Sequence, residues 1–383
     1  MPWNAPASVD VFCRVIDNFG DAGVCLRLAR QLVVEHGCTV RLFCDQPAML
    51  LLLDAAPPTG LVYLDWASQC KVQPASGVVS GFGCNLDAAY LQAMTQAPTP
   101  PRWLHLDYLS AEAWVEGTHG LDSRHPRLGL VQRFCYPGFT PATGGLLKEK
   151  DCAPPWSEVQ SLATLARYGI VPAQGALRVL VFAYAQADFA PLIAASKQLG
   201  RSVHWLICHG EAGDVLAAML GPNAAHSRLP FVHQSAFDAL LRSSHRAWVR
   251  GEDSAIRAIW AGVPSVWQFY AQADHLHLTK MHAYLQRMAN ALAPLMNAST
   301  RVTATTATTL TTAIVAQAHA AANGALSAHA AQSAWDDWLQ GDDPAAVARA
   351  WRAHLLTQTP SLAAFCAQYL QAHASCGQKA HAG

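Results

Sequence analysis

The segment Arg250-Gly251-Glu252-Asp253-Ser254 carries an arginine and two carboxylates between two apolar runs of the sequence. A stretch with helical spacing follows it, so the order reads as strand, polar turn and short helix. Ser254 is a good N-cap residue, which would direct the positive end of the helix dipole toward the turn. A helix N-terminus beside Arg250 suits a phosphate or diphosphate. The alternative is an ordinary strand–helix connection with a solvated turn.

A second polar turn, near the start of the chain, holds two more carboxylates, Asp17 and Asp21. A short apolar run precedes it, and residues 24–34 follow with helical spacing, as in the first unit of a Rossmann-like domain. Gly20 and Gly23 are the turn's glycines, so it is not a GxGxxG dinucleotide fingerprint. The carboxyl end of a strand is where open α/β sheets bind ligands. The two aspartates could instead serve only as turn and capping residues.

Strand-like and helix-like stretches alternate on both sides of a long loop, which we expect at residues 136–155 because glycine and proline are frequent there. The expected strands are residues 9–16, 39–44, 61–66, 77–83, 102–106, 176–184, 203–208, 228–232, 247–249 and 265–269. Further helices are expected from residue 107 onward and at residues 156–168, 345–356 and 362–372. This alternation predicts an α/β fold of two Rossmann-like domains that face a central cleft.

Residues 300–331 are rich in alanine and threonine. A low-complexity linker is one interpretation, but Leu310, Ile314, Ala318 and Ala321 favour a weakly amphipathic helix. We expect residues 376–383 to form a frayed tail.

The composition argues against several classes of function. A chain of 383 residues exceeds the usual size of one core, which predicts two domains. Twenty-six basic residues balance 26 acidic ones, so no global field favours nucleic acid or an anionic membrane. The first residues lack a signal-peptide pattern, and no apolar run is long enough for a membrane span. We therefore expect a soluble, cytoplasmic protein.

The 11 cysteines and 17 histidines predict neither disulfides nor a metal site. The sequence has no CxxC or CxxH pair, and cysteines scattered through apolar segments suit reduced, buried thiols. His275 and His277 do not share a helix face, so we expect no metal ion there.

Five sequence blocks carry a resemblance to a known family. In chain order they are DVFCRVIDNFGDAGVCLRLARQL, LDYLSAEAWVEGTHGLDS, PGFTPATGGLL, PFVHQSAFDALL and RGEDSAIRAIWAGVPSVWQ. Together they resemble the bacterial elongation factor P arginine rhamnosyltransferases over almost the whole chain, least so after residue 300. The resemblance implies a GT-B glycosyltransferase that works without a cofactor or metal. It would transfer L-rhamnose, with inversion, from dTDP-β-L-rhamnose to a guanidine nitrogen of one arginine in elongation factor P.

The resemblance also assigns roles to parts of the chain. Residues 1–158 would form the acceptor-binding domain, and residues 159–360 would bind the nucleotide sugar. Residues 361–383 would form a C-terminal helix and tail that could pack back on the first domain.

Individual residues match the family's functional positions. Asp21 matches the proposed general base, and Asp17 matches its neighbour in the same loop. The residues that match donor-site positions are Phe182, Tyr184, Phe231, Gln234, Arg250, Glu252, Asp253, Ser254, Tyr270, Gln272 and Asp274. Two positions depart from the family's pattern, since Leu26 and Ala255 stand where aromatic or larger residues are usual.

The matched donor residues have different implied tasks. Phe182 and Tyr184 would be donor-site aromatics, and Phe231 and Gln234 would stack on and hydrogen-bond thymine. The segment 250–254 would hold the diphosphate and the neighbouring sugar. Its backbone amides would take the phosphate, and the side chains of Glu252 and Asp253 would bind ribose or sugar hydroxyls. Tyr270, Gln272 and Asp274 would reach phosphate or sugar hydroxyls.

These residue types suit transfer to arginine. A guanidinium is a poor nucleophile because it stays protonated and its lone pairs are delocalised. A carboxylate beside it can orient it and accept a proton as the new bond forms, which suits Asp17 and Asp21. Fixed positive charge from Arg250 and helix amides would stabilise the departing dTDP without a metal ion.

Two other functions remain open from the sequence. One is a different GT-B enzyme, such as another sugar transferase or a nucleotide-sugar epimerase, because a fold alone does not define a reaction. The other is a non-catalytic protein that binds elongation factor P and retains the nucleotide-sugar pocket. The presence of both Asp17 and Asp21 argues against the second alternative.

Overall fold

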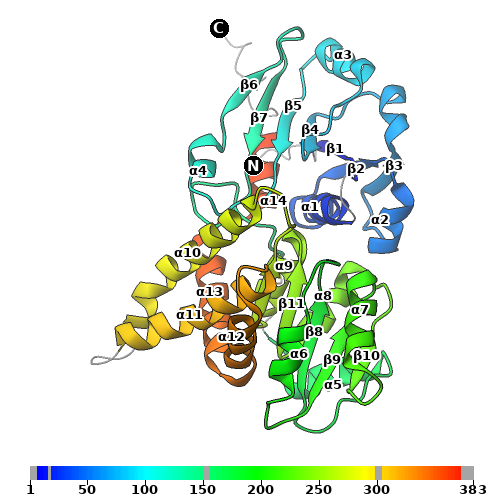
Figure 1. The fold of residues 1–383 in the computed structure, drawn as a ribbon. Helices are drawn as coiled ribbons and strands as arrows, with labels where there is room; N and C mark the ends of the chain where they lie inside the picture. Colours follow the sequence, from blue (N-terminus) through cyan, green and yellow to red (C-terminus); the bar gives the residue numbers. More distant parts are fainter. Residues whose placement is uncertain (1–6, 16–18, 151–154, 298–303, 372–383) are drawn as a thin grey trace. The chain divides into compact units, whose positions relative to one another are not determined.

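The structure is a computed structural model that describes residues 7–15, 19–150, 155–297 and 304–371, with backbone only at 295–297 and 304–311 (Figure 1). It divides into two compact units. The first unit comprises Met1–Asp151 and Gln358–Gly383, and the second comprises Cys152–Thr357.

The first unit contains a seven-stranded sheet in the order β3-β2-β1-β4-β5-β7-β6. All its neighbouring strands are parallel except the pair β6 and β7. Its strands are β1 (Ser8–Cys13), β2 (Thr39–Cys44), β3 (Leu61–Asp65), β4 (Gly77–Gly81), β5 (Arg102–Leu106), β6 (Asp122–Arg124) and β7 (Val131–Cys135). Its helices are α1 (Gly20–His36), α2 (Pro47–Leu53), η1 (Trp66–Lys71), α3 (Ala88–Gln96), α4 (Trp114–Thr118) and α14 (Leu362–Gln371).

Side chains of strand β1 point alternately to the two faces of the sheet and contribute to a separate hydrophobic core on each face. Val9 and Val11 point to the face that α1 and α14 cover, where Leu28 and Leu362 are buried beside them. Phe12 points to the opposite face and stacks on Phe43 at a centroid distance of 4.6 Å. Both faces of this parallel sheet are therefore buried, as in other α/β folds.

The C-terminal helix α14 belongs to the first unit, where Figure 1 shows it in red among the blue and cyan elements. The chain reaches it through a close backbone approach at Gly145, whose φ is +77°. A Cβ atom at this position would lie 2.1 Å from the carbonyl oxygen of Pro360. The N–H of Leu146 donates to the same oxygen at 3.0 Å. Glycine is required there because any side chain would separate the two segments.

The second unit contains a five-stranded parallel sheet in the order β10-β9-β8-β11-β12. Its strands are β8 (Leu177–Phe182), β9 (Val203–Ile207), β10 (His226–Arg228), β11 (Arg246–Arg250) and β12 (Ser265–Gln268). Its helices are α5 (Glu158–Ala166), α6 (Ala190–Ser196), α7 (Glu211–Leu220), α8 (Gln234–Arg242), α9 (Glu252–Ala261), α10 (Leu276–Asn297), α11 (Ala304–Ala322), α12 (Ala328–Gln340) and α13 (Asp343–Gln358).

Tryptophans fill the core of the second unit. Trp248 of β11 stacks on Trp335 of α12 at 5.0 Å, and both are fully buried. The alanine- and threonine-rich stretch is helical in its described part, and Ala318 and Ala322 of α11 lie in the same core. The helix interpretation of this stretch is therefore confirmed for the described residues. Small side chains suit that position because α11 packs closely on α12.

The two-unit α/β fold is confirmed, but the units divide at other positions than residues 158 and 360. Helix α5 follows a capping box at Ser157, and its Glu158 pairs with Arg178 at 2.6 Å. Trp156 packs under the guanidinium of Arg242. The second unit therefore begins before α5 rather than within it.

Most expected elements are present with shifted ends, and three of them differ more clearly from the structure. No helix begins at Asp107, because its N–H donates to Cys135 at 3.0 Å, and the next helix starts at Trp114. The strand expected at residues 228–232 is instead β10, since Pro230 cannot donate to the ladder. Helix α1 begins at Gly20, several residues before its expected start at 24. The hairpin β6–β7 and the helices α10 and α12 were not expected.

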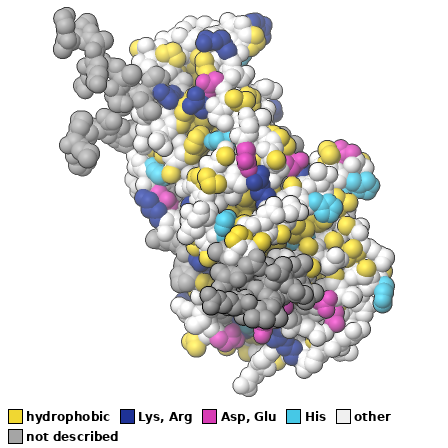
Figure 2. Space-filling model, turned by 90° about the vertical axis from the view of Figure 1, so that its left-hand side faces the viewer, with side chains coloured by type: hydrophobic (Ala, Val, Ile, Leu, Met, Phe, Trp, Pro, Cys, Tyr) yellow, Lys and Arg dark blue, Asp and Glu magenta, His cyan; other side chains and the backbone are white. Residues whose placement is uncertain are grey.

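Surface charge and cysteine state agree with the composition. On the face that Figure 2 shows, Lys and Arg side chains lie in small groups interspersed with Asp and Glu. Every cysteine in the described ranges is a free thiol, and all of these except Cys70 are buried. In the part of the chain that the structure describes, no helix combines the length and apolarity needed to cross a membrane.

Candidate functional site

The helix that follows β11 begins earlier than the sequence predicts. Gly251 is the N-cap of α9 with φ +72°, and Glu252 is the first helical residue. Ser254 is therefore inside the first turn, and the prediction that it caps the helix is wrong. The positive φ of Gly251 allows the sharp entry, while Glu252 and Asp253 complement the helix dipole. The backbone amides of the first turn still point out of the N-terminal end of α9, which follows Arg250 directly after Gly251.

Arg250 lies against two of the expected donor-site aromatics. Its guanidinium carbon is 4.7 Å from the ring centroid of Phe182 and 4.9 Å from that of Tyr184. Tyr184 meets Tyr270 edge-on at 5.4 Å. These residues converge because β8, β11 and β12 are neighbouring parallel strands whose carboxyl ends share one edge. The two rings hold the guanidinium in place at this edge of the sheet, where a guanidinium can bind an anion.

Gln268, at the end of β12, supports this cluster and was missed in the sequence. Its side-chain Oε1 accepts a hydrogen bond from the backbone N–H of Tyr184 at 2.9 Å, and the residue is buried. This bond ties the segment after β8 across to β12. A polar residue at the end of an otherwise apolar strand was the available signal.

Asp253 is engaged by an arginine that the sequence analysis also missed. Arg257, one helical turn later, donates from Nε to Asp253 at 2.6 Å and from Nη1 to Asp238 of α8 at 2.8 Å. Gln234, the first residue of α8, donates to the same oxygen of Asp253 at 3.4 Å. Arg257 is buried, so the carboxylates stabilise its charge. The network fixes α8 against α9, and the i, i+4 spacing of Asp253 and Arg257 could have predicted it.

Phe231 lies in the loop between β10 and α8 with 38% of its surface exposed. It meets His209, which follows β9, edge-on at 6.3 Å. Both residues are therefore at the same edge of the sheet as Arg250. They follow β9 and β10, which lie on one side of β8 and β11, whereas β12 lies on the other. An aromatic ring with an exposed face in this position can stack on a base.

Gln272 and Asp274 lie on the exposed loop between β12 and α10. The N–H of Gln272 donates to His277 Nδ1 at 3.3 Å, and Asp274 accepts from the N–H of Leu276 at 3.2 Å. Both bonds tie the loop to the start of α10, and among the described residues the ring contact with Tyr184 links Tyr270 to the Arg250 cluster.

Asp21 lies in the first turn of α1 with 7% of its surface exposed, rather than in a loop. The N–H of Gly23 donates to Phe19 at 2.8 Å, which extends the helix over both turn glycines, Gly20 and Gly23. A hydrogen bond with Cys25 and burial raise the pKa of the Cys13 thiol, in the last residue of β1, and the negative charge of Asp21 adds to this rise. Asp17 lies outside the described residues.

The two departures from the family's pattern are buried apolar positions. Leu26 is in the core of the first unit, and Ala255 is covered by neighbours in the second. Across the described ranges, no group of three or more His, Cys, Asp or Glu side chains is arranged to hold a metal ion.

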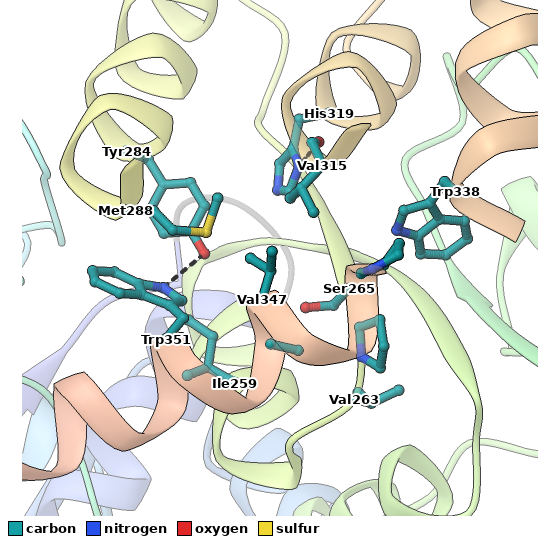
Figure 3. Close-up of a pocket in the computed structure, with 13 residues that line it drawn as sticks. Ile259, Val263, Ser265, Tyr284, Met288, Val315, His319, Trp338, Val347 and Trp351 are labelled. Carbon is teal, nitrogen blue, oxygen red and sulfur yellow. Dashed lines mark hydrogen bonds between the residues drawn. The ribbon is translucent and has the colours of Figure 1, made fainter. Parts of the chain in front are cut away.

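Figure 3 shows a separate pocket at the other end of α9. Ile259 of the last turn of α9 lines it, together with Tyr284, His319 and Trp351. The indole N–H of Trp351 donates to the hydroxyl of Tyr284 at 3.2 Å. Burial lowers the pKa of His319 to about 4, so this side chain is neutral. The residues that line this pocket pack against the C-terminal end of α9, whereas Arg250 precedes its N-terminal end.

Comparison with known proteins identifies relatives over most of the chain. The profile of the family described as Elongation-Factor P (EF-P) rhamnosyltransferase EarP matches residues 9–371. A protein-arginine rhamnosyltransferase of Pseudomonas putida is 40% identical over 305 residues, which cover 73% of this chain and 81% of the relative. A Shewanella oneidensis protein of the same name is 33% identical over 325 residues, covering 74% and 82%.

Two solved structures share the architecture. One, described as the structural basis for EarP-mediated arginine glycosylation of translation elongation factor EF-P, has a TM-score of 0.58 and 26% identity, covering 94% of this chain and 96% of that one. WaaG, a glycosyltransferase involved in lipopolysaccharide biosynthesis, has a TM-score of 0.52 with 12% identity, covering 95% and 99%. The second likeness concerns the GT-B fold alone.

Proposed function

Because this chain belongs to the Elongation-Factor P (EF-P) rhamnosyltransferase family and is a GT-B glycosyltransferase, we propose that it rhamnosylates one arginine of elongation factor P. The donor is dTDP-β-L-rhamnose. In the reaction the bond from the anomeric carbon to the diphosphate oxygen breaks, and dTDP leaves with the electron pair. A guanidine nitrogen forms the new bond from the opposite face, which inverts the anomeric centre. That nitrogen gives up one proton.

The observation that carries the proposal is the position of Arg250 beside the first turn of α9. A leaving diphosphate gains negative charge as its bond to the sugar breaks. Arg250 and the amides of α9 supply positive charge that is already fixed in place, so little reorganisation is needed. The stacking of Arg250 on Phe182 and Tyr184 restricts its motion.

The remaining contacts with the nucleotide sugar come from residues at the same edge of the sheet. Phe231 stacks on thymine, and Gln234 hydrogen-bonds the base from the start of α8. Oδ2 of Asp253 accepts a hydrogen bond from Arg257, so this carboxylate mainly stabilises α9. Glu252, by contrast, can reach the hydroxyls of the ribose or the sugar. No step of the proposal requires a metal ion or a cofactor.

Asp21 is the general base in the first unit. A largely buried carboxylate at the start of a helix can hold a guanidinium, concentrate its positive charge on the far nitrogens and accept a proton. Asp17 orients the same group. Supporting this assignment, Asp21 is in the first turn of the helix that follows the carboxyl end of β1, where α/β sheets bind ligands.

Intact-mass analysis of elongation factor P tests the function. The acceptor is purified unmodified and incubated with this protein and dTDP-β-L-rhamnose, and fragmentation locates any addition. We expect a gain of one deoxyhexose on one arginine. An unchanged acceptor that still binds the protein would favour a non-catalytic binder, and transfer only from other nucleotide sugars would favour a different GT-B transferase.

A further inference from the structure

Gln268 is a buried polar residue at the last position of β12. In the strand order β8-β11-β12, strand β11 lies between Gln268 and the segment that follows β8. The side chain of Gln268 nevertheless reaches that segment, because its Oε1 accepts from the backbone N–H of Tyr184 at 2.9 Å. The residue paired with Gln268 on β11 is Arg250. The hydrogen bond therefore joins the segments on either side of the strand that ends in Arg250.

The amide group of Gln268 has one possible orientation in this bond. A backbone N–H is always a donor, so the atom that faces Tyr184 is the amide oxygen rather than the nitrogen. An apolar residue at position 268 would remove this acceptor. The backbone at Tyr184 would then lose its attachment to β12.

The position of Tyr184 determines one of the two ring contacts of Arg250. The guanidinium carbon lies 4.9 Å from the centroid of the Tyr184 ring, and the same ring meets Tyr270 edge-on at 5.4 Å. A Cβ atom at Gly251 would lie 3.7 Å from the Tyr184 hydroxyl, so this side chain also reaches the N-cap of α9. A shift of the Tyr184 backbone would therefore move the ring that packs against the guanidinium.

The backbone that carries Gln268 is fixed from the other side of β12. This strand is at the edge of the sheet, and Asn323, the residue after α11, binds its outer side. Oδ1 of Asn323 accepts from the N–H of Phe269 at 2.8 Å, and Nδ2 donates to the carbonyl of Trp267 at 3.0 Å. The two bonds resemble those that a further strand would make, and they hold the residues immediately before and after Gln268. Gln268 is therefore a rigid support for Tyr184.

We propose that Gln268 is a positioning residue for the sugar transfer, which acts through Tyr184 to hold the Arg250 guanidinium where the leaving diphosphate forms. The inference rests on the proposed function and adds a residue to it. Fixed charge stabilises a transition state best when it needs no reorganisation as the bond breaks. Without Gln268, Arg250 would keep its charge, but one of the rings that restrict it could move. Loss of Gln268 should therefore lower kcat more than it lowers donor affinity.

The kinetic test uses Gln268→Met, because methionine has a similar length and its thioether is only a weak acceptor. With dTDP-β-L-rhamnose and elongation factor P, kcat should fall about five- to ten-fold, the scale of one lost hydrogen bond, and the donor KM should change less. In a Tyr184→Leu background the same change should lower kcat by less than about two-fold, because the ring through which Gln268 acts is absent. Gln198→Met, at an exposed position after α6, is the matched control.

A spectroscopic test observes Arg250 directly and requires no substrate. The Nε–H resonance of Arg250, assigned from its loss in Arg250→Lys, should be displaced in the parent by the ring currents of Phe182 and Tyr184. Gln268→Met should move this resonance toward that of an exposed arginine, whereas Gln198→Met should leave it in place. Thermal midpoints establish that each variant is folded. Gln268→Asn keeps an amide but is one methylene shorter, and it carries both tests if Gln268→Met unfolds.

The outcomes separate this proposal from the proposed function. A parent protein that transfers no rhamnose would contradict the proposed function, while the Arg250 resonance would still show whether Gln268 positions the guanidinium. Parental kcat and an unmoved Arg250 resonance in the folded Gln268 variant would overturn the positioning role and leave the proposed reaction intact. An equal loss of kcat in the parental and Tyr184→Leu backgrounds would also overturn it, since Gln268 would then act by another route.

Discussion

The guanidinium of Arg250 lies over the ring of Phe182, with 4.7 Å between the guanidinium carbon and the ring centroid. The stacking places a permanent cation at the start of α9, and its strength depends on a planar, delocalised group. Lysine at this position would keep the charge but lose both stacking contacts and the fork of N–H donors. The pair therefore explains why an arginine, and not simply a positive charge, follows β11.

Removing Arg250 should damage chemistry at least as much as binding. In Arg250→Ala, kcat with saturating donor should fall by at least the factor by which dTDP affinity falls, because negative charge on the diphosphate grows in the transition state. Steady-state kinetics and calorimetry with dTDP provide the two numbers. Arg167→Ala, an exposed arginine after α5, is the control. If only the apparent donor affinity changed, Arg250 would be an ordinary binding residue.

Phe231 should account for recognition of the base. Stacking of a base on an aromatic ring contributes roughly 1–3 kcal/mol, so Phe231→Ala should weaken dTDP binding by about one to two factors of ten. Calorimetry measures the Kd directly. Val215→Ala removes a comparably exposed apolar side chain from α7 and should leave the Kd unchanged. An equal Kd in Phe231→Ala and the parent would place thymine elsewhere.

Arg257 should be a stability residue. Its buried guanidinium bridges Asp238 and Asp253, so Arg257→Met leaves two carboxylates without their shared cation. Because Asp238 is partly exposed, we expect a loss of about 2–3 kcal/mol, somewhat below the cost of breaking a fully buried pair. Urea unfolding provides the measurement, with Arg349→Met on the exposed face of α13 as control. Equal stability of the two variants would show that the network contributes little.

His319 should make stability depend on pH. Its pKa is near 6.5 in the unfolded chain and about 4 in the folded protein, so the unfolded state takes up the proton first. Stability is therefore complete above pH 6.5 and decreases as pH falls toward 4. Between pH 7.5 and 5.5 the loss attributable to His319 should be roughly 1 kcal/mol.

The comparison of His319→Leu with the parent isolates this effect. The urea midpoint of the variant should change less over that pH interval, whatever its stability at pH 7.5. His282→Leu, an exposed position on α10, should keep the parental pH dependence. Identical pH dependence in His319→Leu and the parent would show that another group titrates.

The sequence predicted elements well where burial dictates the pattern. The bounds expected for β2 and β5 coincide with those of the structure, because both strands are short, mostly apolar segments between turn-forming residues. It failed where tertiary contacts override local preference. Gly20, Asp21 and Gly23 disfavour a helix, yet they form its first turn, and Gly251 rather than Ser254 caps α9.

The site was predictable only in part. The family resemblance identified Phe182, Tyr184 and Arg250, and the structure brings them together. It did not identify Gln268, because the bond from Gln268 to Tyr184 depends on the order β8-β11-β12, which the spacing of residues along the chain does not contain.

Asp21→Asn provides the most direct test of the mechanism. Asparagine keeps the size of the side chain but removes the charge that orients the acceptor guanidinium and takes its proton. Intact-mass time courses of elongation factor P with saturating dTDP-β-L-rhamnose should show deoxyhexose transfer at least ~10²-fold slower than with the parent, as is typical for loss of a general base. The Kd for dTDP should stay within a few-fold of the parental value, because the donor residues lie in the other unit. Transfer by Asp21→Asn at the parental rate would contradict the account, since the base would then have to be another residue.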